Sequence, residues 1–135
     1  MKRVLLLFVT VITAFSLLAC SGRIKGDDAK VHINGFFDAI ENEDYELATT
    51  YLHPERPADL RAYFENIENK EGLDFSNIEI DKYTGSSSAF YDSSVGGATY
   101  SLCMDVHIND VSVEIDIEIV KNDNGYGIYN LDIDT

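Results

Sequence analysis

The sequence predicts an α+β fold in which two or three N-terminal helices pack on a curved antiparallel sheet. Apolar residues recur at helical spacing between residues 29 and 71. After Gly72 the apolar period changes from 3.6 to 2, which is typical of strands. The chain has 135 residues, 45% of them hydrophobic, which suits one domain with its own core. Helices followed by strands favour the α+β class, with helices on one sheet face.

The first 19 residues predict a secretory signal segment. Lys2 and Arg3 precede 16 residues without a charge. A helix of that length covers about 24 Å, which is shorter than the hydrocarbon core of about 30 Å. A positive start, an apolar middle and a small residue, Ala19, before the cleavage point indicate a segment that is removed.

The run Leu17-Leu18-Ala19-Cys20 resembles the lipobox of bacterial lipoproteins. The resemblance implies cleavage after Ala19, lipidation of the Cys20 thiol and acylation of the new amino terminus. Two or three acyl chains such as palmitate hold a protein stably on a membrane. An ordinary signal peptide, or an uncleaved anchor, remains the alternative. With Cys20 lipidated, Cys103 has no partner for a disulfide.

The implied location is the extracytoplasmic face of a membrane. By resemblance to known sorting, Ser21 after Cys20 favours the outer membrane if the cell has one. Residues 20–28 predict a flexible tether, in which Arg23 and Lys25 either contact anionic headgroups or are simply solvated. Residues 29–135 form the expected domain.

The charge of the chain excludes a nucleic-acid partner. Residues 20–135 carry 8 Lys and Arg against 24 Asp and Glu, a net charge of −16. Phosphate binding needs clustered bases, which this composition lacks.

Three helices are expected between residues 29 and 71. Ile33, Phe36, Phe37 and Ile40 form one apolar stripe. Asp44 can cap a second short helix. Pro57 is placed as the first residue of a third helix, which ends before Gly72.

Strands are expected over residues 75–83, 88–92, 100–108 and 111–119, followed by a closing strand that contains Leu131. Asn109-Asp110 reads as a two-residue turn. A three-residue loop at 123–125 sets Ile115, Ile117 and Ile119 opposite Ile133, Leu131 and Tyr129, which matches apolar with apolar.

This register gathers five carboxylates on the other face of the sheet. Asp105, Glu114 and Asp134 form one row, and Cys103, Asp116 and Asp132 form the next. The patch is open to three interpretations: a solvated face that opposes aggregation, a weak cation patch, or a docking surface for a basic protein partner.

The whole pattern resembles the nuclear transport factor 2-like superfamily, which has a cystatin-like cone shape, and in particular its small bacterial lipoproteins. The segments that carry the resemblance are GFFDAIENEDYELATTYLHPE (residues 35–55) and NDNGYGIYNLDI (residues 122–133), in which Tyr126 stands where a Trp is frequent. The superfamily includes isomerases, dehydratases and polyketide cyclases, and also binding or accessory domains without chemistry. The fold therefore does not decide the function.

No catalytic residue is assigned. Tyr51, Tyr63, Tyr100 and Tyr129 are expected on inner faces as core residues, and the three histidines on the surface or in loops. Phosphate-loop, nucleophile-elbow, metal-ligand and cofactor motifs are not found in the sequence.

The expected function is a lipid-anchored binding or accessory domain that takes a small apolar ligand in the cone or a protein partner. The alternatives are a pocket enzyme of the isomerase, dehydratase or cyclase type, and an envelope inhibitor or structural lipoprotein. An interior filled by Phe36, Ile40, Leu102 and Ile117 would favour surface interaction over both pocket hypotheses.

Overall fold

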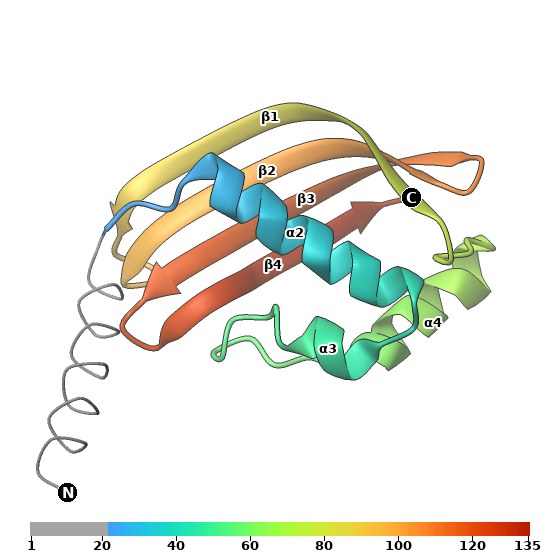
Figure 1. Ribbon diagram of the computed structural model, residues 1–135, viewed down its shortest axis with the longest axis horizontal. Helices are drawn as coiled ribbons and strands as arrows, with labels where there is room; N and C mark the ends of the chain where they lie inside the picture. Colours follow the sequence, from blue (N-terminus) through green and yellow to red (C-terminus); the bar gives the residue numbers. More distant parts are fainter. Residues whose placement is uncertain (1–21) are drawn as a thin grey trace, which may run out of the picture.

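The computed structural model describes residues 22–135, which form three helices and a four-stranded antiparallel sheet in the order β1-β2-β3-β4 (Figure 1). This is the α+β class that the sequence predicts. The elements are α2 (Gly26–Glu41), α3 (Tyr45–Thr49), α4 (Leu60–Glu71), β1 (Ile78–Asp92), β2 (Gly97–Ile108), β3 (Val111–Asn122) and β4 (Gly125–Asp134).

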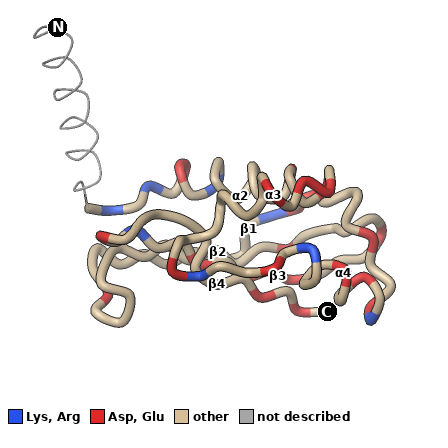
Figure 2. The backbone as a smooth tube through the Cα atoms, turned by 90° about the horizontal axis from the view of Figure 1, so that it is seen from below, with Lys and Arg blue, Asp and Glu red and all other residues tan. Residues whose placement is uncertain are grey.

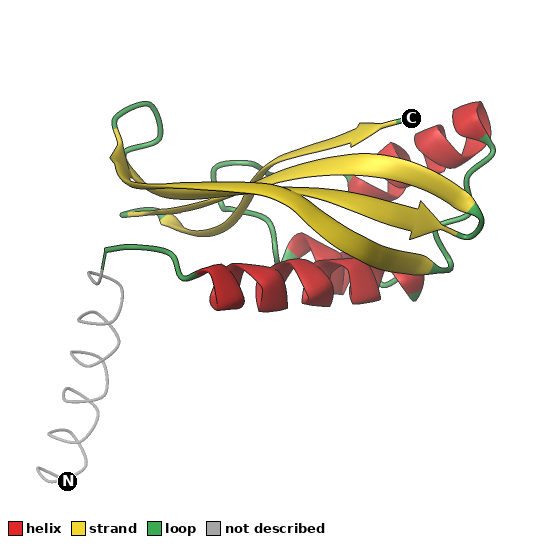
Figure 3. Cartoon of the chain, turned by 90° about the horizontal axis from the view of Figure 1, so that it is seen from above, coloured by secondary structure: helices red, strands yellow, loops and turns green. Residues whose placement is uncertain are grey.

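Helix α2 supplies the layer that covers the inner face of the sheet (Figure 3). It begins at Gly26, inside the segment 20–28 that was expected to be a tether, and Ile24 before it is only 4% exposed. Asp27 and Asp28 in its first turn stabilise the helix, because their negative charges lie at the positive end of the helix dipole. The folded domain therefore includes part of the predicted tether.

The two shorter helices are set by aspartate caps. Asp44 accepts a hydrogen bond from the Leu47 amide of α3 at 3.1 Å, as expected. Helix α4 begins at Leu60, three residues later than the prediction from Pro57, because Asp59 accepts from the Ala62 amide at 3.1 Å. Gly72 ends α4 in the left-handed conformation, with φ 66°.

Strand β1 is one strand of 15 residues, whereas two short strands were expected. Its pairing with β2 is interrupted three times by bulges or irregularities, the first between Ile80 and Lys82. Such interruptions break the period-2 pattern on which the sequence prediction depended. They also make the edge strand irregular, which opposes pairing with the edge of another sheet.

The hairpin of β2 and β3 has the predicted register. Ile108 pairs with Val111 across the Asn109-Asp110 turn, and Leu102 pairs with Ile117. Ile115 and Ile117 face Ile133 and Leu131, also as predicted.

The start of β4 differs from the prediction. Asn122 pairs with Gly125, so the turn has two residues, 123 and 124, instead of three. The register is restored by a shift between Glu118 and Ile119, where Ile119 faces Ile128 instead of Tyr129. Tyr129 is thus an extra residue in β4, which a pattern of alternating residues does not reveal.

The outer edge of β4 is partly covered by the chain that follows α3. The His53 amide donates to Ile128 O at 2.9 Å, and the Ile128 amide donates to Tyr51 O at 2.9 Å. A Cβ on Gly127 would lie 2.5 Å from the His53 nitrogen, so the close approach requires glycine.

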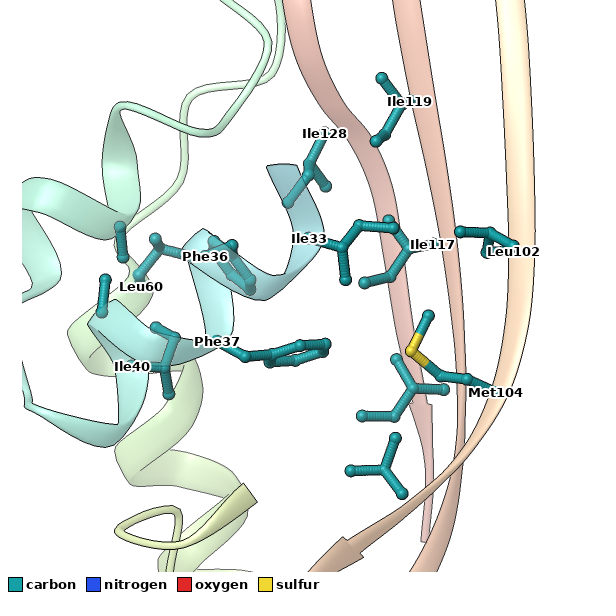
Figure 4. Packing of buried hydrophobic residues seen from close by; sticks show 14 of the residues in the cluster. Ile33, Phe36, Phe37, Ile40, Leu60, Leu102, Met104, Ile117, Ile119 and Ile128 are labelled. Carbon is teal, nitrogen blue, oxygen red and sulfur yellow. The ribbon is translucent and has the colours of Figure 1, made fainter. Parts of the chain in front are cut away.

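The space between α2 and the sheet is filled by side chains. Phe36, Ile40, Leu102 and Ile117 are each 0–1% exposed. Figure 4 shows Ile33 and Phe37 of α2 directed at the strands. The Phe64 ring contacts Phe36 and Phe75 at centroid distances of 6.3 and 4.9 Å. Burial of one such side chain stabilises the fold by about 1.5–3 kcal/mol.

Candidate interaction surface

The five carboxylates predicted to share one patch lie on the outer face of the sheet. Asp105 pairs with Glu114, and Glu114 pairs with Asp134. The neighbouring row is Cys103, Asp116 and Asp132. We call these five residues, Asp105, Glu114, Asp116, Asp132 and Asp134, the acidic face.

The alternation of β2 and β3 explains why these side chains face solvent. Leu102, Met104, Ile115 and Ile117 point to the core and are 0–1% exposed, so the residues between them point outward. Figure 2 shows acidic positions along these strands and along the chain toward the C-terminus.

One corner of the acidic face meets a base on the edge strand β1. Lys82 Nζ lies 3.4 Å from Asp105 Oδ2, and the lysine side chain is 64% exposed. An exposed pair of this kind contributes at most about 1 kcal/mol. The Lys82–Asp105 pair therefore offsets little of the negative charge that the five carboxylates place on this face.

Cys103 lies within the carboxylate rows as a protonated thiol. Its hydrogen bond to Asp116 raises the thiol pKa above the ordinary value, and partial burial and the charges of Asp116 and Glu114 act in the same direction. A thiol held in this form is a poor nucleophile. Cys103 is therefore a structural residue of the face.

A shallow hollow of about 350 Å³ lies over this row of the sheet. Its lining comes from β2, β3 and β4 and is Ser101, Leu102, Cys103, Asp116, Ile117, Glu118, Asn130, Leu131 and Asp132. At its rim, Asn130 donates from Nδ2 to Glu118 Oε1 at 2.8 Å. The hollow offers a partner both acceptor oxygens and a small apolar floor.

The carboxylates do not converge on a point. In the part of the chain that the structure describes, no three His, Cys, Asp or Glu side chains are placed to share a metal ion. They lie along strands, and a Ca²⁺ site instead wraps six to eight oxygens around the ion. This geometry suits a partner with several spaced positive charges more than a single cation.

The tyrosines considered for chemistry occupy the rim of the fold. Tyr51 and Tyr100 are half-buried against the core, and Tyr63 is 36% exposed. Tyr129 was expected to face the core opposite Ile119, but Ile128 takes that place. The Tyr129 ring instead contacts the His53 ring at a centroid distance of 5.4 Å, and Arg56 Cζ lies 4.3 Å from the centroid of the Tyr129 ring.

The histidines divide between surface and interior. His107 is on the outer face of the sheet, as expected from its position between Val106 and Ile108. His32 on α2 donates from Nε2 to Tyr51 O at 2.8 Å, and burial lowers its pKa. The His32 ring also contacts the Tyr51 and Tyr126 rings, at centroid distances of 4.9 and 5.0 Å.

His53 was expected in a loop, where it lies, but it is 1% exposed. Its Nδ1 accepts the Glu55 amide at 3.1 Å, so the ring proton is on Nε2 and is donated to Asn122 Oδ1 at 3.0 Å. Glu55 Oε2 lies 3.7 Å from the same Nδ1, which already accepts the Glu55 amide.

Asn122 joins three connections of the fold, a role that its sequence context did not predict. Its Nδ2 donates to Glu55 Oε2 at 2.8 Å and to Val95 O at 2.9 Å. Its Oδ1 accepts from His53 and from the Asn124 amide at 3.0 Å. Asn124 Nδ2 also donates to Glu55 Oε1 at 2.7 Å, and the two asparagine side chains lower the Glu55 pKa. The sequence signal was His53-Pro54 and the Asn-rich turn, but only the fold brings them together.

An apolar hollow of about 270 Å³ lies between α4 and β4. Its lining is Leu52, Arg56, Pro57, Ala58, Leu60, Tyr63, Ile128, Tyr129, Asn130 and Leu131. It opens on the surface and is separate from the filled space between α2 and the sheet.

The predicted lipidation residue Cys20 lies outside the described residues. Among residues 22–135, no helix has the length and apolar character to cross a bilayer. Comparison of the chain with protein-family models, curated proteins and solved structures finds no match.

Proposed function

We propose that this chain is a lipid-anchored protein of the cell envelope whose acidic face binds a basic protein partner. The observation that carries the proposal is the pairing of carboxylates across β2, β3 and β4 on a solvent-facing surface, with the interior of the fold filled. A filled interior leaves the surface as the place where this domain can bind.

The distribution of charge supports a basic partner. Residues 22–135 carry a net charge of −16, and the acidic face has Lys82 at one corner. Complementary charge raises the rate of encounter and selects against acidic partners. Strands spread carboxylates at spacings of about 5 Å across neighbours and about 7 Å along a strand, which suits an extended basic segment or a basic helix.

The anchor follows from residues 1–20. A basic start, 16 uncharged residues and the run Leu17-Leu18-Ala19-Cys20 support removal of the leader and lipidation of Cys20. The protein would then be held on the extracytoplasmic face of a membrane, which is the outer one if the cell has two.

Membership of the nuclear transport factor 2-like superfamily is part of the same proposal. Three helices against one curved antiparallel sheet are compatible with its cone-shaped, cystatin-like plan. The superfamily contains accessory domains as well as enzymes, and the filled interior favours an accessory role.

Partner capture from solubilised membranes tests the binding function. The acidic-face variant changes Asp105, Asp116, Asp132 and Asp134 to Asn and Glu114 to Gln. A matched variant, called the helix control, removes the same charge from the helices and the connection after α2, through Asp38→Asn, Glu43→Gln, Glu46→Gln, Glu65→Gln and Glu71→Gln. We expect a basic protein to be retained by the wild type and the helix control and lost from the acidic-face variant. Equal retention by all three would overturn the proposal.

The anchor has its own test. Mass spectrometry of the membrane fraction should give an N-terminal Cys20 that carries acyl chains. An intact Met1, or Cys20 without lipid, would contradict lipid anchoring and leave the acidic face to be judged by the capture experiment alone.

A further inference from the structure

The chain enters the fold at the end of the sheet that carries the β1–β2 and β3–β4 turns. Figure 1 and Figure 3 show the start of α2 and both turns at this end, and the C-terminus and the β2–β3 turn at the other. Gly22 contacts the Phe90 ring so closely that a Cβ on Gly22 would lie 2.7 Å from Phe90 Cε2. Phe90 therefore contacts a residue that follows Cys20 by only two positions in the sequence.

Three large apolar side chains are exposed at this end. Phe90 and Tyr91 at the end of β1 are 68% and 65% exposed, and Val31 on α2 is 71% exposed. Neighbouring exposed aromatic residues indicate a surface that contacts another phase or molecule. Phe and Tyr suit the boundary between headgroups and acyl chains, where an apolar ring and a polar tip are both accommodated.

One hollow at the same end is lined by more bases than acids, although the domain is strongly acidic. A hollow of about 320 Å³ is lined by Arg23, Ile24, Lys25, Asp28, Val31, Lys121 and Tyr126. It thus takes 3 of the 8 bases of residues 22–135 and 1 of the 24 acids. Figure 2 shows basic positions where the described chain begins.

The basic hollow and the exposed rings adjoin. A second hollow, of about 360 Å³, is lined by Gly22, Phe90, Tyr91, Gly96, Gly97, Ala98, Lys121, Asn122 and Asp123, so Lys121 belongs to both. The exposed rings and the bases therefore line two hollows that meet at Lys121, and Asp28 and Asp123 are the acidic residues of these linings.

We propose that this end of the domain lies on an anionic bilayer, with Phe90 and Tyr91 in the interface and Arg23, Lys25 and Lys121 over lipid phosphates. The inference rests on the proposed lipid anchor, because Cys20 two residues from Gly22 leaves little chain to separate this surface from the membrane. Each base near such a surface raises the affinity for the membrane about fivefold. The strands then project away from the bilayer, and the acidic face is presented sideways to a partner.

The chain contains no Trp, so a single introduced Trp reports its own surroundings. We would reconstitute the lipidated protein as Phe90→Trp in vesicles of equal phosphatidylcholine and phosphatidylglycerol. The matched control is Val111→Trp, which replaces a side chain that is 47% exposed at the opposite end of the sheet. We expect a blue shift of the Phe90→Trp emission and quenching by brominated acyl chains, with neither effect for Val111→Trp.

Two further arms test the bases. Phosphatidylcholine alone, or the triple change Arg23→Gln, Lys25→Gln and Lys121→Gln, should reduce the quenching of Phe90→Trp. Quenching that is the same with and without anionic lipid would overturn the role of the bases.

The anchor and the orientation fail in different ways. A protein that carries lipid and sediments with vesicles, but whose Phe90→Trp spectrum matches that of Val111→Trp, would overturn the orientation and leave the anchor standing. A protein that carries no lipid on Cys20 and does not sediment would overturn both.

Discussion

Asn122 is the residue on which the connections of this fold converge. Its side chain makes four hydrogen bonds, to His53, Glu55, Val95 and Asn124. Two of these partners lie in the segment after α3, one in the β1–β2 turn and one in the β3–β4 turn. A fully satisfied amide of this kind fixes the relative positions of segments that share no regular pairing.

Replacement of Asn122 should destabilise the domain strongly. Asn122→Ala leaves the buried Nε2–H of His53 without an acceptor and frees the Val95 carbonyl, at a cost of about 2–4 kcal/mol in the free energy of unfolding. Asn130→Ala is the matched control, because it removes one exposed bond to Glu118. Urea unfolding measures both, and equal losses would show that Asn122 has no special role.

Cys103 should react slowly with thiol reagents. Its pKa is raised by the hydrogen bond to Asp116 first, and then by burial and by Asp116 and Glu114 charges. Because the thiolate is the reactive form, alkylation by iodoacetamide should stay slow until the pH exceeds the ordinary thiol value of 9.0. Asp116→Asn lowers the pKa and should shift the rate profile to lower pH. An unshifted profile, identical to that of Asp134→Asn, would contradict the assignment.

At the scale of elements, β4 is shaped by contacts that lie outside the sheet ladder. The segment at Leu52 and His53 pairs with Ile128, and the shift at Tyr129 lets the strand both accept this neighbour and keep its apolar residues inward. The edge of the sheet is thus protected over the first half of β4.

Gly127 is the residue that this arrangement requires. Gly127→Ala sets a Cβ against the His53 nitrogen and the Leu52 carbonyl carbon, at 2.5 and 2.6 Å, so the segment must separate from β4. We expect a loss of about 3 kcal/mol in stability. In Gly85→Ala the new Cβ would meet Cys103 at 3.9 Å, an ordinary contact, so thermal unfolding of this control should match the wild type.

The local signals that the sequence carries fall within single elements. Alternation along β2 and β3 was enough to set Asp105, Glu114 and Asp116 on the outer face. Asp132 and Asp134 of β4 fall in the predicted rows because the extra residue at Tyr129 compensates for a turn that is one residue shorter than expected. Asp44 and Gly72 mark helix ends by short-range chemistry. The start of α4 was predicted too early because Pro57 and Asp59 are competing signals, and the cap prevailed. The bulge at Tyr129 and the buried His53 depend on contacts between distant segments, which no local pattern encodes.

At the scale of the whole molecule, the basic hollow and the acidic face lie at different places on the surface. The bases Arg23, Lys25 and Lys121 gather where the chain enters the fold, and the carboxylates of the acidic face occupy the outer sheet. The rows of the acidic face agree with the predicted register because the shorter β3–β4 turn and the extra residue at Tyr129 compensate each other. The basic hollow was not predictable, because it joins the first described residues to the end of β3.

Repulsion between the carboxylates of the acidic face should lower the stability of the domain when no partner is bound. Glu114 lies between Asp105 and Asp134, so Glu114→Gln removes repulsion on both sides. We expect the midpoint of thermal unfolding to rise by about 3 °C at low salt and by less at high salt. Glu43→Gln, in the connection after α2, should leave the midpoint unchanged. A fall in the midpoint for Glu114→Gln would show that the rows are compensated.

The proposed binding function requires contact between the acidic face and a basic partner in the living cell. Photo-crosslinking measures this contact directly, with p-benzoylphenylalanine in place of Ser112 beside the acidic face, or in place of Glu46 on α3 as the control. We expect an adduct with a basic protein from position 112 that disappears in the acidic-face variant, and no such adduct from position 46. An adduct that forms equally from both positions, or that survives removal of the five carboxylates, would contradict binding through the acidic face.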